Sequence, residues 1–263
     1  MADPVRLTPS LCEKVWGRKR LRPWFPDSET PIGEAWYLAD GDLPLLVKLL
    51  FTSERLSVQV HPDDGEDGAR GKTEMWHILE AEPGASIALG FREPLDRERL
   101  REAALSGDVE RLIRWIEVKP GETYFTPAHT VHAIGAGIAL CEIQQNSDVT
   151  YRLWDYGRPR ELHVEQAVAV ADRTVHPGAM RTGEAVRSRH FVTELVRLEA
   201  GAELRLAAET CHLWIVLEGQ GSIGGQGFRQ AEVWLLPGES AIRAETAGRF
   251  LRTYVPGSTP DAG

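Results

Sequence analysis

The sequence lacks the features that would place the chain outside the cell, in a membrane or on nucleic acid. Its three cysteines, Cys12, Cys141 and Cys211, are too few and too far apart for a disulfide framework. The N-terminal residues MADPVRLTPS show no basic segment followed by an apolar run, and no stretch reaches the ~18 uncharged apolar residues of a membrane span. The formal net charge of −9 disfavours a nucleic-acid surface. We therefore expect a cytoplasmic chain without nucleic-acid or membrane partners.

Short apolar runs separated by turns dominate what is present. Runs such as LPLLVKLL, LSVQV and SIALGF are typical of β-strands, and segments such as PGE and GAG supply turns. A second series of such runs begins near residue 191. Each series contains a PGE turn, at 120–122 and at 237–239, as two copies of one unit would. The pattern predicts a mostly β protein built from two barrel or jelly-roll units.

Two segments have the periodicity of helices instead. Residues 94–114 place apolar residues at helical spacing on both sides of a Ser-Gly-Asp break, and they predict a small helical insertion in the first unit. Residues 161–172 predict an amphipathic connecting helix. We therefore expect a first domain over residues 1–172, a connector over 173–190 and a second domain over 191–258.

Residues with metal-binding side chains follow or open the strands of the first unit. Strand alternation along LSVQVHPDD places Gln59 and His61 on one face, just before a proline ends the strand. Glu74 opens the run EMWHIL, and His132 lies in PAHTVHAIG. Two imidazoles and one carboxylate, with Gln59 as a further donor, suit zinc or another divalent metal. Each residue alone is more often structural or exposed, and spacing does not distinguish His132 from the nearby His129.

A second polar cluster lies in CEIQQNSDVTYR. Glu142 shares a strand face with Leu140 and Gln144, and Asp148 and Arg152 follow the strand. A carboxylate in a pocket can move protons, and an arginine can bind a phosphate group bidentately. By composition alone, a surface set of ion pairs is the more common explanation.

These segments together carry a resemblance. The runs LPLLVKLL, LSVQVHPDD, GKTEMWHIL and PAHTVHAIGAGIALCEIQQNSDVTYRLWDYGR resemble the short bacterial class of type I mannose-6-phosphate isomerases. The resemblance is close over residues 14–165, which include Trp16-Gly17 and the GEAW of residues 33–36, and it holds only in outline beyond them. The order QVHPDD, GKTE, SDVTYR is its most specific part.

The resemblance implies two cupin units and one catalytic zinc ion per chain. The implied zinc ligands are Gln59, His61, Glu74 and His132. The implied pocket residues are Lys72, Glu142, Asp148 and Arg152, and the sequence does not decide which of them moves the proton. The implied reaction interconverts mannose 6-phosphate and fructose 6-phosphate through a cis-enediol. The partner is then a small sugar phosphate, and the oligomeric state, monomer or homodimer, stays open.

Two departures from the family pattern leave alternatives. Relatives usually carry a helical segment between the GExW motif and the PLLVK strand, whereas residues 37–43 are nearly all that remains here, so another sugar phosphate stays open as the substrate. The second unit has His212 and Glu218 but no HxH pair, and we expect it to bind no metal. An oxidising iron cupin is a further alternative, which Gln59 as a fourth ligand argues against. A non-catalytic sugar-phosphate sensor is another, which the intact SDVTYR run argues against.

Overall fold

The computed structural model describes residues 3–39, 41–68, 70–176, 185–207 and 211–257. The first unit contains β2 (Pro9–Arg18), β3 (Ile32–Tyr37), β4 (Leu45–Phe51), β5 (Val58–Val60), β6 (Glu74–Ala81), β7 (Ser86–Phe91), β8 (Ile113–Glu117), β9 (Thr123–Thr126), β10 (His132–Ile134), β11 (Ile138–Gln145) and β12 (Tyr151–Trp154). The remaining strands are β1 (Val5–Leu7), β13 (Ala185–Arg187), β14 (Val192–Leu198), β15 (Glu203–Leu206), β16 (His212–Glu218), β17 (Gly221–Ile223), β18 (Gln226–Phe228), β19 (Val233–Leu236), β20 (Ser240–Ala244) and β21 (Gly248–Tyr254). The helices are α1 (Arg97–Ser106), α2 (Val109–Leu112) and α3 (Val164–Val170).

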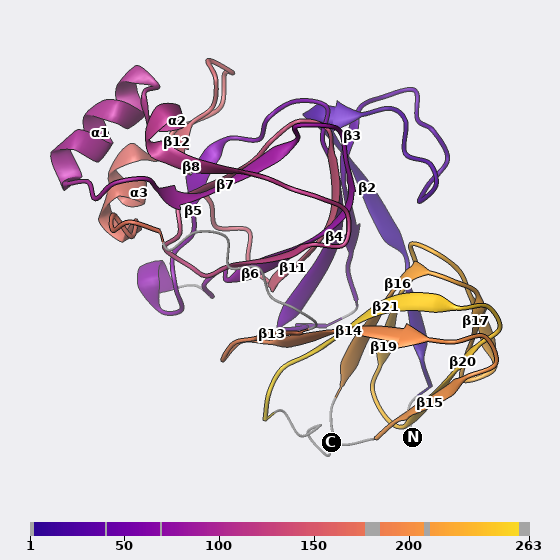
Figure 1. Cartoon of the computed structure of the whole chain (residues 1–263). Coiled ribbons are helices and arrows are strands. Elements are labelled where there is room, and N and C mark those ends of the chain that lie inside the picture. The colour runs from indigo at the N-terminus through magenta and orange to yellow at the C-terminus, as the bar shows by residue number, and fades with distance from the viewer. Residues whose placement is uncertain (1–2, 40, 69, 177–184, 208–210, 258–263) are drawn as a thin grey trace.

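The described strands form four sheets in two units. The first unit pairs the sheet β2-β3-β4-β11-β6-β9 with the sheet β12-β5-β10-β7-β8. The second unit pairs β1-β19-β16-β21-β14-β13 with β15-β20-β17-β18. Figure 1 shows the helices at the far side of the first unit, with the second unit on its opposite side. The predicted fold class, mostly β with two cupin-like units, a helical insertion and a connecting helix, is confirmed.

The sheet around β4, β11 and β6 is buried on both faces. All seven residues of β4 are buried, which explains why the run LPLLVKLL is apolar apart from Lys48 in an antiparallel sheet. Val47 and Leu49 face outward with Cys141 of β11. Leu50 points the other way, into the space between the two sheets of the first unit, where it packs with Leu140 of β11. This strand alternation sorts the side chains of the sheet into two environments.

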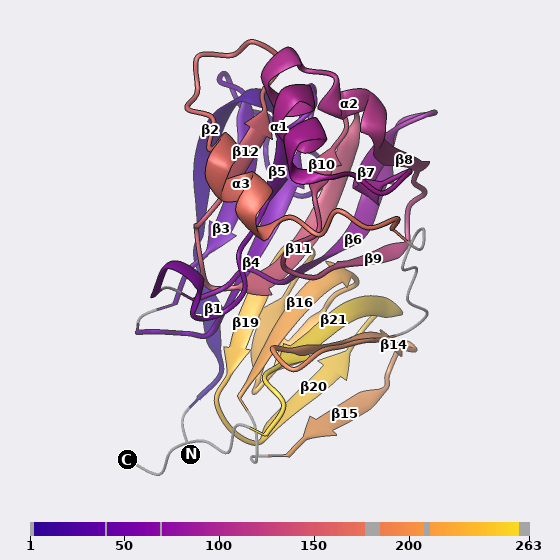
Figure 2. The same ribbon diagram turned by 90° about the vertical axis from the view of Figure 1, so that its left-hand side faces the viewer.

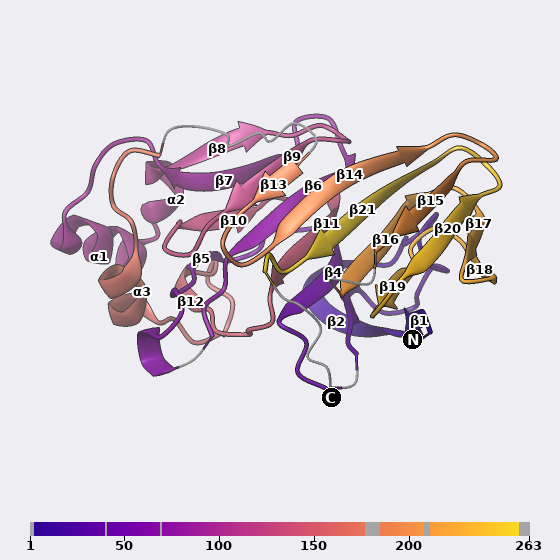
Figure 3. The ribbon, with the colours of Figure 1, turned by 90° about the horizontal axis from the view of Figure 1, so that it is seen from below.

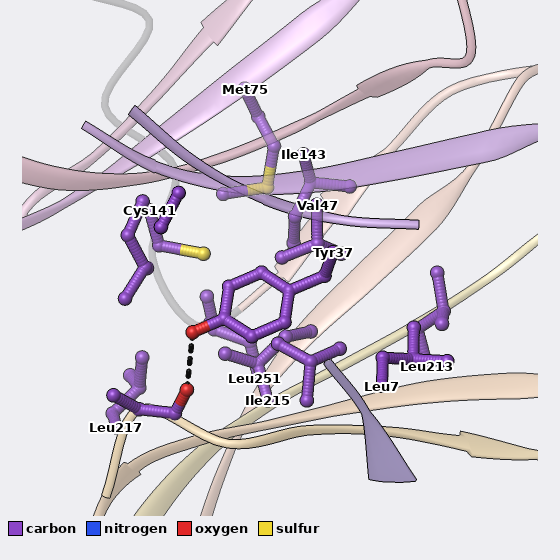
Figure 4. Close-up of a cluster of buried hydrophobic side chains, with 14 of the residues drawn as sticks. Leu7, Tyr37, Val47, Met75, Cys141, Ile143, Leu213, Ile215, Leu217 and Leu251 are labelled. Atoms are coloured by element: carbon purple, nitrogen blue, oxygen red, sulfur yellow. Dashed lines mark hydrogen bonds between the residues drawn. The ribbon is translucent and has the colours of Figure 1, made fainter. Parts of the chain in front are cut away.

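The outward face of this sheet packs against the second unit. Leu213, Ile215 and Leu251 of the second unit belong to the same apolar cluster as the outward residues of β4 and β11. Figure 4 shows Tyr37 between the two sheets, where its hydroxyl donates a hydrogen bond to the Ala231 carbonyl. Figure 3 shows the same layering from below, with β14 and β21 running alongside β6 and β11. The two units therefore share one hydrophobic core.

The helices cover the outer face of the sheet that contains β5 and β12. Asp96 caps α1 by accepting a hydrogen bond from the backbone N–H of Arg99, and Gly107 ends the helix in the left-handed conformation, with φ of 87°. Figure 2 shows α1 and α3 lying over β5 and β12. Val58 and Val60 of β5 pack against these helices, so the residue between them points inward. None of the helices in the described part of the chain has the length and apolar character of a membrane span.

The interior of the second unit is filled by apolar side chains. Trp214, Trp234 and Phe250 are at most 1% exposed and lie between its two sheets. Phe228 and Ile242 of the opposite sheet complete this cluster. Large apolar side chains therefore fill the space between the two sheets of the second unit, as they do in other small barrels.

Several boundaries differ from those that the sequence suggested. Strand β1 lies within the expected domain 1–172 but pairs with β19 of the second unit, and β13 lies within the expected connector 173–190 but pairs with β14. Residues 177–184 of that connector, and residues 208–210 and 258 of the second domain, lie outside the described residues. The ten-residue strand β2 was missed because it is an edge strand with several exposed positions, so its sequence carries no apolar alternation.

The shared core predicts how the chain unfolds. Replacing Ile215, 1% exposed between the units, by alanine (Ile215→Ala) should lower the free energy of unfolding by about 2–5 kcal/mol through lost burial and a cavity. The matched control Leu105→Ala, at a side chain that is 57% exposed, should cost less than about 0.5 kcal/mol. Urea unfolding followed by both fluorescence and circular dichroism should give one transition. Two separate transitions, or equal costs for the two variants, would contradict a common core.

Candidate metal centre and active site

Three buried side chains converge at one point inside the first unit. His61 directly follows β5, while Glu74 and His132 are the first residues of β6 and β10. Each side chain is only 1% exposed. The Glu74 Oε1 atom lies 3.2 Å from His61 Nε2 and 3.1 Å from His132 Nε2. The two sheets of the first unit thus contribute to one His/Glu/His group, and its ligand atoms all lie within 4.8 Å of one another.

Backbone hydrogen bonds fix the orientation of both imidazoles. The Nδ1 atom of His61 lies 2.8 Å from the Val149 carbonyl, and that of His132 lies 2.8 Å from the Thr130 carbonyl. Because a carbonyl only accepts, each Nδ1 carries a proton and donates. Burial, together with the nearby Lys72 ammonium, lowers the pKa of His61 to about 3, which keeps that ring neutral. The Nε2 atoms therefore present lone pairs, as in metal-binding histidines.

The carboxylate of Glu74 faces these lone pairs without a hydrogen bond. Both of its oxygens are buried and have no hydrogen-bond donor among the described residues. Although burial opposes ionisation, the charge of the nearby Lys72 ammonium holds the pKa of Glu74 well below its usual range. An ionised carboxylate buried beside two acceptor nitrogens is costly unless a cation lies between them. Two nitrogens and one carboxylate are the donor set that zinc and related divalent metals prefer, so the residues fit such an ion.

Gln59 lies at the edge of this group. It is in register with His132 of β10 on one side and with Arg152 of β12 on the other, so all three side chains share one face of the sheet. Its Nε2 atom is 3.3 Å from His132 Nε2, and its Oε1 atom accepts a hydrogen bond from Ser57. These two contacts decide which end of the Gln59 side-chain amide is the oxygen and which is the nitrogen. A role for Gln59 as a fourth ligand stays a prediction.

Two lysines and a second carboxylate surround the group. Lys72 Nζ lies 3.6 Å from Glu74 Oε2 and 3.2 Å from His61 Nε2. Lys48 Nζ lies 3.3 Å from Glu142 Oε1 and 4.4 Å from the centre of the Trp36 ring. Sequence reasoning missed Lys48, although a lone lysine within LPLLVKLL was a usable signal. A cation in a run that is otherwise apolar needs a partner on the same face.

Glu142 is the carboxylate best placed to exchange a proton near neutrality. It is 4% exposed and accepts a hydrogen bond of 3.1 Å from the Trp76 indole. Burial and the neighbouring charge of Glu74 raise the pKa of Glu142 to about 7. A carboxyl group with such a pKa can take up and release protons at physiological pH.

The other expected site residues are placed differently. Arg152 is half-buried beside Gln59, and its Nε atom is buried without a hydrogen-bond acceptor among the described residues. Asp148 is exposed and is not one of the residues that converge in the His/Glu/His group. His129 turns away from the group and lies 2.8 Å from Glu66. The structure thus places His132, and not His129, against Glu74.

The fold and this group define a cupin-like β protein with a candidate metal centre. No protein-family model matches the chain. Two relatives from Bacillus subtilis are the probable mannose-6-phosphate isomerase GmuF, 33% identical over 87% of this chain and 90% of the relative, and the mannose-6-phosphate isomerase ManA, 36% identical over 89% and 93%. The chain therefore belongs to the mannose-6-phosphate isomerase family.

Solved structures agree with this assignment. The crystal structure of the Bacillus subtilis mannose 6-phosphate isomerase matches with a TM-score of 0.78 and 27% identity, over 96% of this chain and 99% of that chain. A putative mannosephosphate isomerase from Archaeoglobus fulgidus matches with a TM-score of 0.80 at 18% identity, over 96% of this chain and 97% of that chain, and shows the common fold alone. The predicted family is thereby confirmed, whereas the roles of individual site residues stay predictions.

The two neighbouring histidines provide a direct test of the metal centre. The variant His132→Ala should weaken binding of a divalent cation by at least about 100-fold, because one of three converging donors is lost. The control His129→Ala should keep normal affinity, since this ring contacts Glu66 instead. Metal content after dialysis, measured by atomic emission, distinguishes the two. Retention of one metal ion per chain by His132→Ala, with loss in His129→Ala, would reverse the assignment.

Proposed function

We propose that the chain is a zinc-dependent isomerase that interconverts mannose 6-phosphate and fructose 6-phosphate through a cis-enediol. The observation that carries the proposal is the convergence of two imidazole lone pairs and an ionised carboxylate on one buried point. The proposed zinc ligands are His61, Glu74 and His132, with Gln59 as the fourth. Both relatives from Bacillus subtilis carry the name of this activity. The place of action is proposed to be the cytoplasm, with the chain as a monomer or a homodimer.

The reaction moves one proton between the carbons C1 and C2 of the sugar and a second proton between the oxygens O1 and O2. Removing the proton from C2 of the aldose, or from C1 of the ketose, leaves negative charge on the oxygens of the enediol. A zinc ion bound by the His/Glu/His group would supply Lewis-acid stabilisation of that charge. The surrounding residues are almost fully buried, so few water molecules compete for the proton or screen the charge.

Proton transfer needs a carboxylate within reach of C1 and C2. Glu142 is favoured because it is buried in the interior and held by Lys48 and the Trp76 indole, whereas Asp148 is exposed. A base that is fixed in a dry interior loses less activity to reorientation than one on a solvated loop. We therefore assign proton transfer to Glu142 and an outer position to Asp148.

The cationic residues would hold the anionic parts of the substrate. Lys72 lies beside Glu74. Burial lowers the pKa of its ammonium group, but the negative charges of Glu74 and Glu142 outweigh this effect. The pKa of Lys72 is therefore raised, and the group stays charged. Arg152 presents a buried guanidinium nitrogen that has no acceptor among the described residues. A planar guanidinium suits a phosphate or an enediolate. We propose that Lys72 stabilises the developing charge and that Arg152 binds the phosphate or the enediolate.

A coupled assay tests the activity itself. The purified, zinc-loaded chain should convert mannose 6-phosphate to fructose 6-phosphate, lose this turnover on chelation and regain it when zinc is added back. Glu74→Gln serves as a matched control, because it changes one carboxylate into its neutral isostere and should stay inactive with added zinc. Full turnover after complete chelation would contradict the metal dependence. An absence of turnover in the zinc-bound chain would exclude mannose 6-phosphate as the substrate and direct the assay to other sugar phosphates.

A kinetic series tests the assigned roles. Glu142→Gln and Arg152→Ala should each lower kcat/KM by at least about 100-fold, because each removes a group that acts on the reacting sugar. Both should keep one zinc per chain, since neither is an expected ligand. Asp148→Asn is the control and should lose less than about tenfold, because its side chain is exposed. A large loss in Asp148→Asn with near-normal activity in Glu142→Gln would transfer the proton-moving role to Asp148.

A further inference from the structure

The loop that joins β5 to β6 carries site residues at both of its ends. His61 begins it, and Lys72 lies two residues before Glu74. Its ends meet, because the backbone N–H of Lys72 donates a hydrogen bond of 3.1 Å to the Pro62 carbonyl. We call the meeting point, formed by residues 62–64 and 71–72, the loop base. The loop base therefore connects the backbone next to His61 with the backbone of Lys72.

Close backbone packing and hydrogen bonds to residues of the first unit hold the two ends of the loop base together. A Cβ atom at Gly71 would lie 2.5–2.8 Å from backbone atoms of Asp63 and Asp64, so only glycine permits this approach. The Oδ1 atom of Asp64 accepts hydrogen bonds from the Gly71 N–H, at 2.8 Å, and from the side chain of Gln145, at 2.9 Å. The backbone N–H of Asp64 also donates a hydrogen bond of 2.8 Å to Asp63 Oδ1, so the two carboxylates lie close together next to His61, a proposed metal ligand.

The second unit supplies the positive charge that these two carboxylates face. Arg189 NH2 lies 2.5 Å from Asp63 Oδ2. His190 accepts a hydrogen bond from Arg189 Nε at its Nε2 atom, so its Nδ1 atom carries the ring proton and points to Asp64 Oδ2 at 3.5 Å. The side chain of His190 is only 11% exposed. Both contacts join residues that are more than 120 positions apart in the sequence.

The segment that carries Arg189 and His190 is itself well anchored. Phe191 is 0% exposed in the core shared by the two units, and its ring meets that of Phe125 edge to face at 6.4 Å. Ser188 accepts hydrogen bonds from the backbone N–H groups of His190 and Phe191. The turn is therefore a fixed point of the second unit rather than a loosely attached loop.

We propose that Arg189 and His190 are positioning residues for the metal centre, through which the second unit sets the loop base and hence the placement of His61 and Lys72. The proposal rests on the proposed metal-dependent function. The ion pair between Arg189 and Asp63 is partly exposed, and such pairs contribute little to global stability. We therefore assign this ion pair a role in local geometry. An error of about 1 Å in the placement of a catalytic group can cost about 100-fold in rate, and residues that support metal ligands typically alter metal affinity by about 10–100-fold.

The test compares Arg189→Ala with Arg205→Ala. Arg205 is a similarly exposed arginine of the second unit, but it pairs with Glu203 of its own strand β15 rather than with the loop base. Arg189→Ala should weaken zinc affinity about tenfold in competition with a chromophoric chelator. It should also speed hydrogen exchange at the amides of Gly71 and Lys72 and leave Tm unchanged. Arg205→Ala should change none of these, and Arg189→Lys should restore most of the affinity by keeping the charge.

A second variant and the activity readout complete the experiment. His190→Ala should weaken zinc affinity in the same direction as Arg189→Ala. Equal zinc affinity and equal exchange rates in Arg189→Ala and Arg205→Ala would overturn the proposal, as would an affinity loss that parallels a fall in Tm. Weakened affinity in a chain that does not turn over mannose 6-phosphate would sink the proposed activity and leave the positioning role intact. Normal isomerase activity together with unaltered zinc affinity in Arg189→Ala would support the proposed activity and contradict the positioning role.

Discussion

The double burial of the sheet around β4, β11 and β6 constrains everything else in the molecule. Its outward residues form the core shared with the second unit, and its inward residues line the first unit. Because strand side chains alternate, a slip of one residue in the register of β11 would bring Glu142 to the outer, apolar face and Cys141 to the inner one. The register that builds the shared core is thus the register that builds the site.

The inner face gathers charges that a purely structural interior would avoid. Glu74, Glu142, Lys48 and Lys72 are all at most 5% exposed. A buried ion carries a desolvation penalty of several kcal/mol, and well-packed apolar residues in its place are often more stabilising. The retention of two carboxylates and two ammonium groups in one interior therefore indicates a chemical task. The pKa of Glu142 is raised and that of Glu74 is lowered, so the two neighbouring carboxyls differ in how readily they ionise.

Sequence reasoning reached most of the fold because the strands of both units are apolar and separated by clear turns. It reached the family because three short motifs occur in a specific order. It missed β2, because this exposed edge strand has no alternation of apolar and polar residues. It also missed that β1 and β13 pair with strands of the second unit, because the partner of a strand is not encoded in its local sequence. The choice between His129 and His132 also needed the structure. Their spacing is compatible with either, and the backbone of His129, with φ of 70°, turns its ring away.

The two units resemble each other in architecture but differ in what lies between their sheets. The first unit combines the apolar cluster around Leu50 and Leu140 with the buried charges of the site, whereas large apolar side chains fill the second. Trp214, Trp234 and Phe250 pack together between the sheets of the second unit. Burying a side chain such as leucine or isoleucine contributes about 1.5–3 kcal/mol, so a few residues of the shared core offset the desolvation of an ion in the first interior. The shared core thus contributes to the stability of the unit that carries the buried charges. The same interface brings Arg189 within reach of Asp63, beside the site.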